Sequence, residues 1–247
     1  MLSQEYEKYT ATDHKTWSVL FNRQLDAVQK FAYNQFLTGI QQLGFKEECI
    51  PNFKNVNQKL KPITGWQVFA VPGLIDNKLF FQQMKARKFA ATTWIRKPEQ
   101  IDYLEEPDMF HDVFGHVPLL TDPLIANYLR SLAIIAESYI ENPEVVEAIA
   151  RLYWYTIEFG LVKEKKQLKI YGAGILSSIA ETAYCYSDEP RLINFDIEKI
   201  VATPYIKDSF QQQYFVLDSM HDLEEAIPML DEYLKWNYAQ NEIEKVF

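Results

Sequence analysis

The run from Pro107 to Pro118 holds the residues best suited to chemistry, because two of the chain's four histidines lie five positions apart in it. Neutral imidazole is the commonest side-chain ligand of transition metals, and two imidazoles with one carboxylate form the facial triad of non-haem iron(II) oxygenases. His111 and His116 are therefore candidate metal ligands. The alternative at this point is a pair of partly buried histidines that cap a helix end.

The spacing of the two histidines constrains the backbone between them. In an α-helix each residue turns by about 100°, so side chains five positions apart diverge by about 140° and do not share a face. Gly115 and Pro118 are residues that allow a helix to end. We therefore predict that the helix stops there and that His116 turns back toward His111.

A metal site of this kind needs a carboxylate, and Glu158 is the most interesting candidate. It follows an aromatic run, Tyr153-Trp154-Tyr155, a setting typical of a partly dry environment. Helical periodicity favours the opposite interpretation, because Glu158 shares a stripe with Glu147 and Arg151 that would place its carboxylate in solvent. The local pattern leaves both interpretations open.

Three other features have weaker signals. Arg96 ends an apolar run, where a guanidinium could clamp a carboxylate with two parallel hydrogen bonds, although a surface arginine at a strand end is the simpler interpretation. The glycines of Tyr171-Gly172-Ala173-Gly174 form neither a GxGxxG nor a P-loop motif, so a structural turn before a helix is favoured. His14 and His221 lack ligand-like spacing and are interpreted as surface or capping residues.

Composition excludes several classes of partner. The chain has 25 basic and 34 acidic residues among 247, a net charge of −9, which disfavours nucleic acid. Its only cysteines, Cys49 and Cys185, do not form a disulfide framework, which favours a reducing cytoplasm. The sequence shows neither a leader pattern nor a long apolar run, so we expect no membrane partner and no export.

Periodicity and turn residues predict a mainly α fold with small β elements (α+β), organised as a single domain over residues 1–247. We expect one long helix from Asp13 to just before Gly44, an irregular connection over 51–62, and strands at 66–71 and 89–95 around a helix that begins near Asp76. Asp122-Pro123 and Asn142-Pro143 predict helices over 123–140 and 143–160. A hairpin (162–171), a short helix (177–186), a strand and turn (191–205) and a terminal helix (222–236) complete the expected order.

Taken together, these segments resemble the catalytic domain of the pterin-dependent aromatic amino acid hydroxylases, and within them the compact bacterial phenylalanine 4-hydroxylases. The resemblance covers most of the chain and is specific as an ordered set, whereas each piece alone is weak. Its motifs are Trp66 with Val71-Pro72-Gly73-Leu74-Ile75, Trp94-Ile95-Arg96, Tyr103-Leu104-Glu105-Glu106-Pro107-Asp108, His111 to Pro118, Tyr153-Trp154, Glu158-Phe159-Gly160, Tyr171-Gly172-Ala173-Gly174 and Ser177-Ser178.

The resemblance implies a role for each matching residue. His111, His116 and Glu158 would be the catalytic iron(II) ligands. The substrate residues would be Arg96 on the amino acid carboxylate, Gly174 and Ser177 in the same pocket, and Trp154 near the aromatic ring. Tetrahydrobiopterin or a related tetrahydropterin would stack on Phe80, meet the backbone around Leu74 and Ile75, and lie near Asp112.

The activity implied is hydroxylation of a free aromatic amino acid by dioxygen, with L-phenylalanine to L-tyrosine expected and tryptophan hydroxylation as the alternative. From another class, a metal-dependent hydrolase could use His111-Asp112 as an HD-type dyad or the two histidines and Glu158 on zinc, but further upstream histidines and an HExxH helix are absent. A non-catalytic pterin- or amino-acid-binding module is a third possibility.

The sequence also departs from the animal members of the family. It lacks their N-terminal regulatory domain and C-terminal tetramerisation helix, so we expect a monomer without allosteric activation. Asp112 stands where they carry a longer acid, and Leu104 replaces a threonine associated with the substrate pocket. Pterin geometry and substrate preference therefore do not transfer directly.

Overall fold

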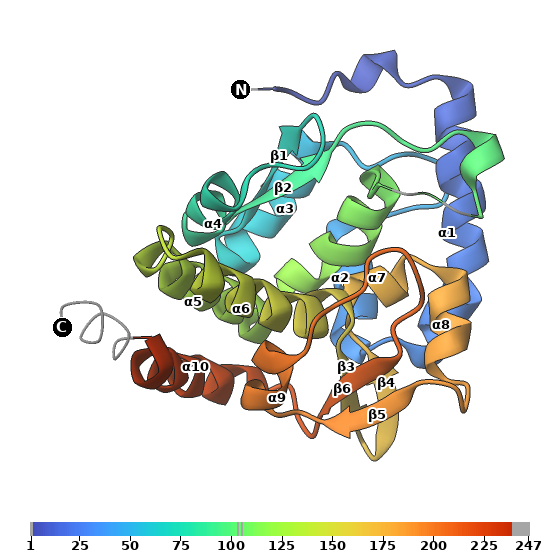
Figure 1. Ribbon diagram of the computed structural model, residues 1–247. Coiled ribbons are helices and arrows are strands. Elements are labelled where there is room, and N and C mark those ends of the chain that lie inside the picture. The colour runs from blue at the N-terminus through green and yellow to red at the C-terminus, as the bar shows by residue number, and fades with distance from the viewer. Residues whose placement is uncertain (1, 103, 105, 239–247) are drawn as a thin grey trace.

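The computed structural model describes residues 2–102, 104 and 106–238, and helices dominate it (Figure 1). The predicted mainly α fold with small β elements is confirmed. With η denoting a 3₁₀- or π-helix, the elements in chain order are η1 (Tyr6–Lys8), α1 (Ala11–Phe31), α2 (Asn34–Leu43), α3 (Phe53–Thr64), β1 (Gln67–Val71), α4 (Asn77–Lys85), β2 (Lys88–Thr92), η2 (Pro98–Gln100), η3 (Phe110–His116), η4 (Val117–Thr121), α5 (Pro123–Ser138), α6 (Pro143–Tyr153), η5 (Trp154–Glu158), β3 (Leu161–Glu164), β4 (Gln167–Ile170), α7 (Ala173–Leu176), α8 (Ile179–Cys185), β5 (Arg191–Asn194), α9 (Ile197–Ala202), β6 (Gln213–Leu217) and α10 (Asp222–Tyr238).

The predicted long N-terminal helix is wrong in one respect, because the chain breaks it into α1 and α2. Ala32 forms a parallel bridge with Ile170, and the amide of Tyr33 donates to the Ile170 carbonyl at 2.8 Å. This pairing with the end of β4 draws the backbone out of the helix. The N-cap is Thr10 rather than Asp13, and α1 begins at Ala11, since the Thr10 hydroxyl and the Asp13 carboxylate form a reciprocal capping box.

The expected irregular connection over 51–62 is also wrong, since most of it is α3. Asn52 caps this helix by accepting from two backbone amides, and Gly65 ends it in the left-handed conformation with φ 81°. Phe53, Val56 and Leu60 form its buried face. The composition of the segment concealed this apolar spacing.

The predicted pair of strands around a helix is confirmed as β1, α4 and β2. The two strands pair in parallel from Gln67 opposite Lys88 to Val71 opposite Thr92. Asp76 caps α4 by accepting from the amide of Leu79. β2 leads directly into the segment that carries Arg96.

The hairpin over 162–171 is confirmed as β3 and β4, but it belongs to a larger sheet with the order β4-β3-β6-β5. The strand β6 was not predicted, and α9 lies where only a turn was expected. β6 pairs in parallel with both β3 and β5, so segments far apart in sequence meet at the sheet's centre. The terminal helix is confirmed as α10.

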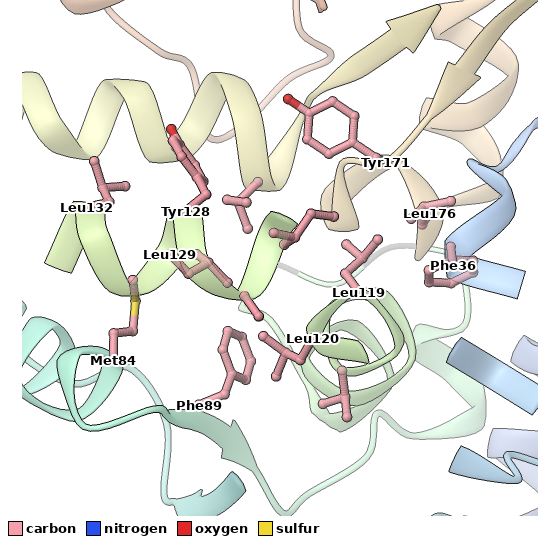
Figure 2. Packing of buried hydrophobic residues seen from close by; sticks show 14 of the residues in the cluster. Phe36, Met84, Phe89, Leu119, Leu120, Tyr128, Leu129, Leu132, Tyr171 and Leu176 are labelled. Atoms are coloured by element: carbon pink, nitrogen blue, oxygen red, sulfur yellow. The ribbon is translucent and has the colours of Figure 1, made fainter. Parts of the chain in front are cut away.

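The hydrophobic core lies between these elements and reaches the histidine motif (Figure 2). Figure 2 shows Leu129 of α5 on the side of Met84 and Phe89, with Leu119 and Leu120 of η4 nearby. Tyr128 and Leu132 point to the opposite side of α5, where the Tyr128 hydroxyl lies 3.1 Å from that of Thr156. The Phe89 ring lies 4.9 Å from the imidazole of His116, measured between centroids. Core packing therefore fixes one of the candidate ligands.

Within the described residues, no single helix has the length and apolar character needed to cross a membrane. Only the bent pair Phe110–Thr121 and Pro123–Ser138, whose axes differ by 108°, meets the length and composition criteria together.

Candidate metal centre

The two histidines lie on one π-helix, η3, which ends at His116 as predicted, but the π geometry and not this helix end brings His116 toward His111. A π-helix is closed by hydrogen bonds from residue i to residue i+5, so side chains five positions apart lie above one another. The 140° divergence expected for an α-helix therefore does not arise. The centroids of the His111 and His116 rings are 5.0 Å apart.

Glu158 lies on a second π-helix, η5, which continues α6. The amide of Phe159 donates to the carbonyl of Trp154 at 2.9 Å and closes this wider turn. The turn rotates Glu158 away from the exposed stripe where Arg151 and Glu147 pair at 3.3 Å. The solvated alternative for Glu158 is thus wrong, since its side chain is only 13% exposed and lies against both imidazoles.

His111, His116 and Glu158 converge on one point. His116 Nε2 is 3.2 Å from Glu158 Oε1 and 3.3 Å from His111 Nε2, and His111 Nε2 is 3.5 Å from Glu158 Oε2. Among the described residues, this is the only set of three His, Cys, Asp or Glu side chains placed to share an ion.

The geometry and chemistry of these donors fit a transition-metal ion. Ligands bound cis at about 2.1 Å are separated by about 3 Å, close to the three observed separations. The two Nε2 atoms face each other at 3.3 Å, a separation that a shared metal ion between them would bridge. Two nitrogens and one carboxylate oxygen on one side match the facial triad of iron(II) oxygenases.

Ser177 sets the tautomer of His111. The Ser177 hydroxyl donates to the Ala173 carbonyl at 2.8 Å, so its oxygen accepts a hydrogen bond from His111 Nδ1 at 3.0 Å. With that proton on Nδ1, the lone pair of Nε2 is free to bind a metal. Ser177, predicted for the substrate pocket, therefore contacts the candidate ligand directly.

Electrostatics favour the metal-binding forms of His111 and Glu158. Burial lowers the pKa of His111, and the neighbouring His116 lowers it further, so its neutral form is favoured. Burial by itself raises the pKa of Glu158, but the charge and hydrogen bonds of His116, with His111, outweigh this and lower the pKa to about 2. The ionised carboxylate and the neutral imidazole are the forms that bind metal.

Arg96 lies in the segment between β2 and η3, and its guanidinium forms two hydrogen bonds with Asp108. Arg96 Nε donates to Asp108 Oδ2 at 2.8 Å and Nη2 donates to Oδ1 at 2.9 Å. Within the described part of the chain, Nη1 has no hydrogen-bond acceptor, so that edge of the guanidinium can receive a carboxylate. Arg96 is thus a buried, oriented residue and not the free surface arginine of the simpler interpretation.

Asp108 is a site residue that sequence reasoning missed. Its carboxylate is fully buried and accepts from the amides of Arg96 at 2.9 Å and His111 at 3.2 Å, besides the guanidinium. It therefore ties the segment after β2 to the start of η3. The signal was an aspartate immediately before an apolar helical run, which is typical of an N-cap.

Asp112 joins the histidine turn to β2 through a hydrogen bond. Its Oδ2 accepts from the amide of Thr92 at 2.7 Å. Burial raises the pKa of Asp112, an effect that the charge of His111 and the Thr92 hydrogen bond oppose. The carboxyl group therefore joins the histidine turn to the β1-α4-β2 unit, where the pterin residues were predicted.

The glycines after Tyr171 allow α7 to pack on the backbone of Glu158. A Cβ at Gly172 would lie 2.5 Å from the Glu158 carbonyl oxygen, and one at Gly174 would lie 3.0 Å from the same atom. The structural interpretation of this motif is supported, since any side chain would push α7 off η5. The place of Gly174 in the substrate pocket stays a prediction.

The remaining predicted residues surround the centre on two sides. Phe80 is half-buried and packs edge-on against Tyr153 with centroids 5.5 Å apart, and the Tyr153 hydroxyl lies against Glu158. Ahead of Phe80, the side chain of Leu74 is 81% exposed, whereas Ile75 is half-buried.

On the other side, the Trp154 indole stacks on Tyr205 with centroids 4.7 Å apart. Leu104 is half-buried outside any helix or strand. Its neighbours Tyr103 and Glu105, members of the same motif, lie outside the described residues.

Comparison with known proteins identifies the family. The model of the biopterin-dependent aromatic amino acid hydroxylases matches residues 5–241. The chain therefore belongs to this family, as the sequence motifs indicated.

Individual relatives are similar over nearly the whole chain. The phenylalanine-4-hydroxylase of Ralstonia nicotianae is 43% identical over 228 residues, which span 91% of this chain and 72% of that protein. The phenylalanine hydroxylase of Chromobacterium violaceum with bound iron(III) and 7,8-dihydrobiopterin superposes with a TM-score of 0.89 at 42% identity, covering 96% of this chain and 86% of that one. Its iron- and phenylalanine-bound form gives a TM-score of 0.87 at 41% identity, covering 94% and 86%.

Proposed function

We propose that the protein is a phenylalanine 4-monooxygenase, which hydroxylates L-phenylalanine to L-tyrosine with dioxygen, iron(II) and a tetrahydropterin. The observation that carries the proposal is the convergence of His111, His116 and Glu158 in a chain of this family. The relatives named above support the substrate, because they are phenylalanine hydroxylases that bind iron, dihydrobiopterin or phenylalanine.

His111, His116 and Glu158 would hold the iron, with Ser177 fixing the His111 tautomer. Iron(II) held on this face would supply open positions for dioxygen, and a tetrahydropterin would supply two electrons. The protein's own part would be to hold the three ligands on one side of the ion and to keep water from the reacting centre.

The amino acid would be oriented at both ends. The free edge of Arg96 would bind its carboxylate through charge-assisted hydrogen bonds, and Asp108 holds the guanidinium in the plane this requires. Trp154 would pack against the substrate ring, with Gly174 and Leu104 bordering the same pocket. An uncharged aromatic side chain suits such a lining.

The pterin would bind on the side of the β1-α4-β2 unit. Phe80 offers a half-buried ring face for stacking, and the backbone around Leu74 and Ile75 offers hydrogen-bonding groups at the rim. Asp112 lies between this unit and the metal ligands, as its hydrogen bond to Thr92 indicates. The reductant and the metal would then lie on adjoining sides of the site.

We further propose that the protein acts as a monomer in the cytoplasm and forms one catalytic domain. One continuous cluster of buried apolar residues, from Trp17 on α1 to Leu234 on α10, supports the single domain. Its two cysteines, Cys49 and Cys185, are both free, which agrees with a reducing compartment. Light scattering at several concentrations tests the monomer, and a mass that rises with concentration would contradict it.

The function is tested by incubating the purified protein with iron(II), dioxygen and a tetrahydropterin and offering phenylalanine, tryptophan and tyrosine in parallel. Mass spectrometry should detect tyrosine formed from phenylalanine as the main product. Preferred hydroxylation of tryptophan would overturn the substrate assignment. Turnover with zinc but not with iron would overturn the oxygenase chemistry altogether.

A further inference from the structure

Gln211 is a buried polar residue outside the metal centre, and its amide group binds two partners. The residue is 3% exposed and precedes β6. Its Oε1 accepts from the indole Nε1 of Trp154 at 3.0 Å, while its Nε2 donates to the carbonyl of Ile206 at 2.7 Å. A side-chain amide can accept and donate in this way with one planar group.

The backbone of Gln211 is itself held from a third direction. Its amide donates at 3.3 Å to Oε1 of Glu181 on α8, a carboxyl group that is 6% exposed and also accepts from the hydroxyl of Tyr214. α8 follows directly on Ser177, the residue that fixes the tautomer of His111. Gln211 thus belongs to a rigid support that starts beside the metal ligands.

The ring contacts of Trp154 do not fix its orientation by themselves. Its indole stacks on Tyr205 at 4.7 Å and tilts against Phe159 at 4.8 Å, and stacked rings can slide or turn over with little loss of contact. A directional hydrogen bond from Nε1 removes that freedom, because any rotation of the ring breaks it. Among the described residues, Gln211 is the acceptor of this bond.

We propose that Gln211 is a positioning residue that fixes the plane of the Trp154 indole against the ring of the amino acid substrate. This inference rests on the proposed function, in which Trp154 packs against that ring. Gln211 does not contact the substrate and acts through Trp154. Its second hydrogen bond, to the Ile206 carbonyl, holds the segment that carries Tyr205 against the indole.

The test is a double-mutant cycle with Q211M and W154F, since methionine keeps the length of glutamine without its amide and phenylalanine keeps an apolar ring without the N–H. Q211M should raise the KM for phenylalanine by about 3- to 10-fold, the range expected for the loss of one hydrogen bond. It should also lower the tyrosine formed per pterin oxidised, because a loosely held ring is attacked less often. The pterin KM and the iron content should not change.

Exposed Gln212, the next residue, provides the matched control Q212M, which should behave as the wild type. The double variant should be no worse than the poorer single variant, because both changes break the same bond. Effects of Q211M and W154F that multiply in the double variant, or a Q211M that matches Q212M, would overturn the proposal.

Calorimetric binding of L-phenylalanine to the iron-loaded protein provides a readout that does not need turnover. The same pattern is expected in Kd: weaker for Q211M and W154F, not additive in the double variant, and unchanged for Q212M. If the Kd values of the variants follow this pattern but the wild type makes no tyrosine, the proposed function is refuted and the positioning role stays supported. Equal Kd values for Q211M and Q212M would refute the positioning role alone.

Discussion

At the scale of single residues, the metal centre depends on where each proton lies. Ser177 accepts a hydrogen bond from His111 Nδ1, so the lone pair of Nε2 faces the centre. Glu158 stays ionised because its pKa is lowered to about 2 by the two histidines despite its burial. An ionised carboxylate and a free imidazole lone pair are the forms that bind metal.

Replacing either histidine should abolish iron binding while the protein stays folded. H111A and H116A each remove one of three ligands, so iron per chain should fall to near zero and tyrosine formation should stop. Metal analysis after gel filtration measures the first effect, and far-ultraviolet circular dichroism checks the fold. The control H221A removes an exposed imidazole that pairs only with Glu224, and it should retain full iron. An iron-replete H111A would contradict the assignment.

Replacing Arg96 should affect stability as well as substrate binding. R96A leaves the carboxylate of Asp108 buried without its cation, which should cost about 3–5 kcal/mol in the free energy of unfolding and raise the KM for phenylalanine. The exposed pair of Arg23 and Asp102 provides the control, since R23A should cost less than about 1 kcal/mol. Urea unfolding and steady-state kinetics measure the two effects.

The double variant R96A/D108N separates the two roles of Arg96. It leaves no charge buried, so it should regain part of the lost stability while the KM stays raised. A KM that recovers together with the stability would show that Arg96 acts only through Asp108.

At the scale of elements, two π-helices bring the ligands together. η3 aligns residues five positions apart, and η5 turns Glu158 from the exposed stripe of α6 toward them. α7 then packs against both, because Gly115 of η3 and the glycines at 172 and 174 allow close contact. The site is thus a product of helix geometry and not of a loop.

A larger side chain between η3 and α7 should push these two elements apart and weaken the metal site. In G115A the new Cβ would lie 2.9 Å from the Ala173 carbonyl oxygen and 3.2 Å from the Ala173 Cβ, so the two elements must separate. We expect a loss of about 1–3 kcal/mol in stability and weaker iron binding, since Ser177 moves with α7. Urea unfolding and iron titration measure these effects.

G73A is the matched control for G115A, because a Cβ at Gly73 meets nothing within 4 Å. Its stability should stay within about 0.5 kcal/mol of the wild type. Equal effects of the two substitutions would show that the contact with Ala173 is unimportant.

At the scale of the whole molecule, the sheet β4-β3-β6-β5 joins the C-terminal segments to the metal centre. β6 carries Tyr214, whose hydroxyl donates to Glu181, and this buried pair fastens α8 to the sheet. Burial raises the pKa of Glu181, although the hydrogen bonds from Tyr214 and Gln211 oppose the effect. Ionising this carboxyl group therefore costs folding free energy.

The pH dependence of stability should reveal that cost. A carboxyl group whose pKa is higher in the folded than in the unfolded state contributes stability below its unfolded pKa and loses it as pH rises through the folded pKa. E181Q cannot ionise, so its stability relative to the wild type should increase between about pH 4 and about pH 7. Urea unfolding of both proteins across this range measures the difference. A difference that is constant with pH would contradict the raised pKa.

Sequence alone determined the family, the mainly α fold, the β1-α4-β2 unit, α5, α6, the hairpin, α10 and the residues that meet at the centre. These features depend on signals local in the chain: caps such as Asp76 and Asn142, prolines at helix starts, and motifs with fixed order. The same local signals gave a wrong prediction where a distant partner decides the conformation. One continuous helix was expected at Ala32, but this residue lies outside α1 and pairs with Ile170.

Only the tertiary structure decided how the ligands converge and what holds them. The π-turns lie within η3 and η5, whereas the clamp of Asp108 on Arg96, the Ser177 hydrogen bond and the support of Trp154 by Gln211 join residues of different segments. A single wide turn changes which face of a helix a side chain occupies, and its cost is met by packing from elsewhere in the chain. Periodicity reports the average geometry of a helix, so it cannot show the one turn where that geometry changes.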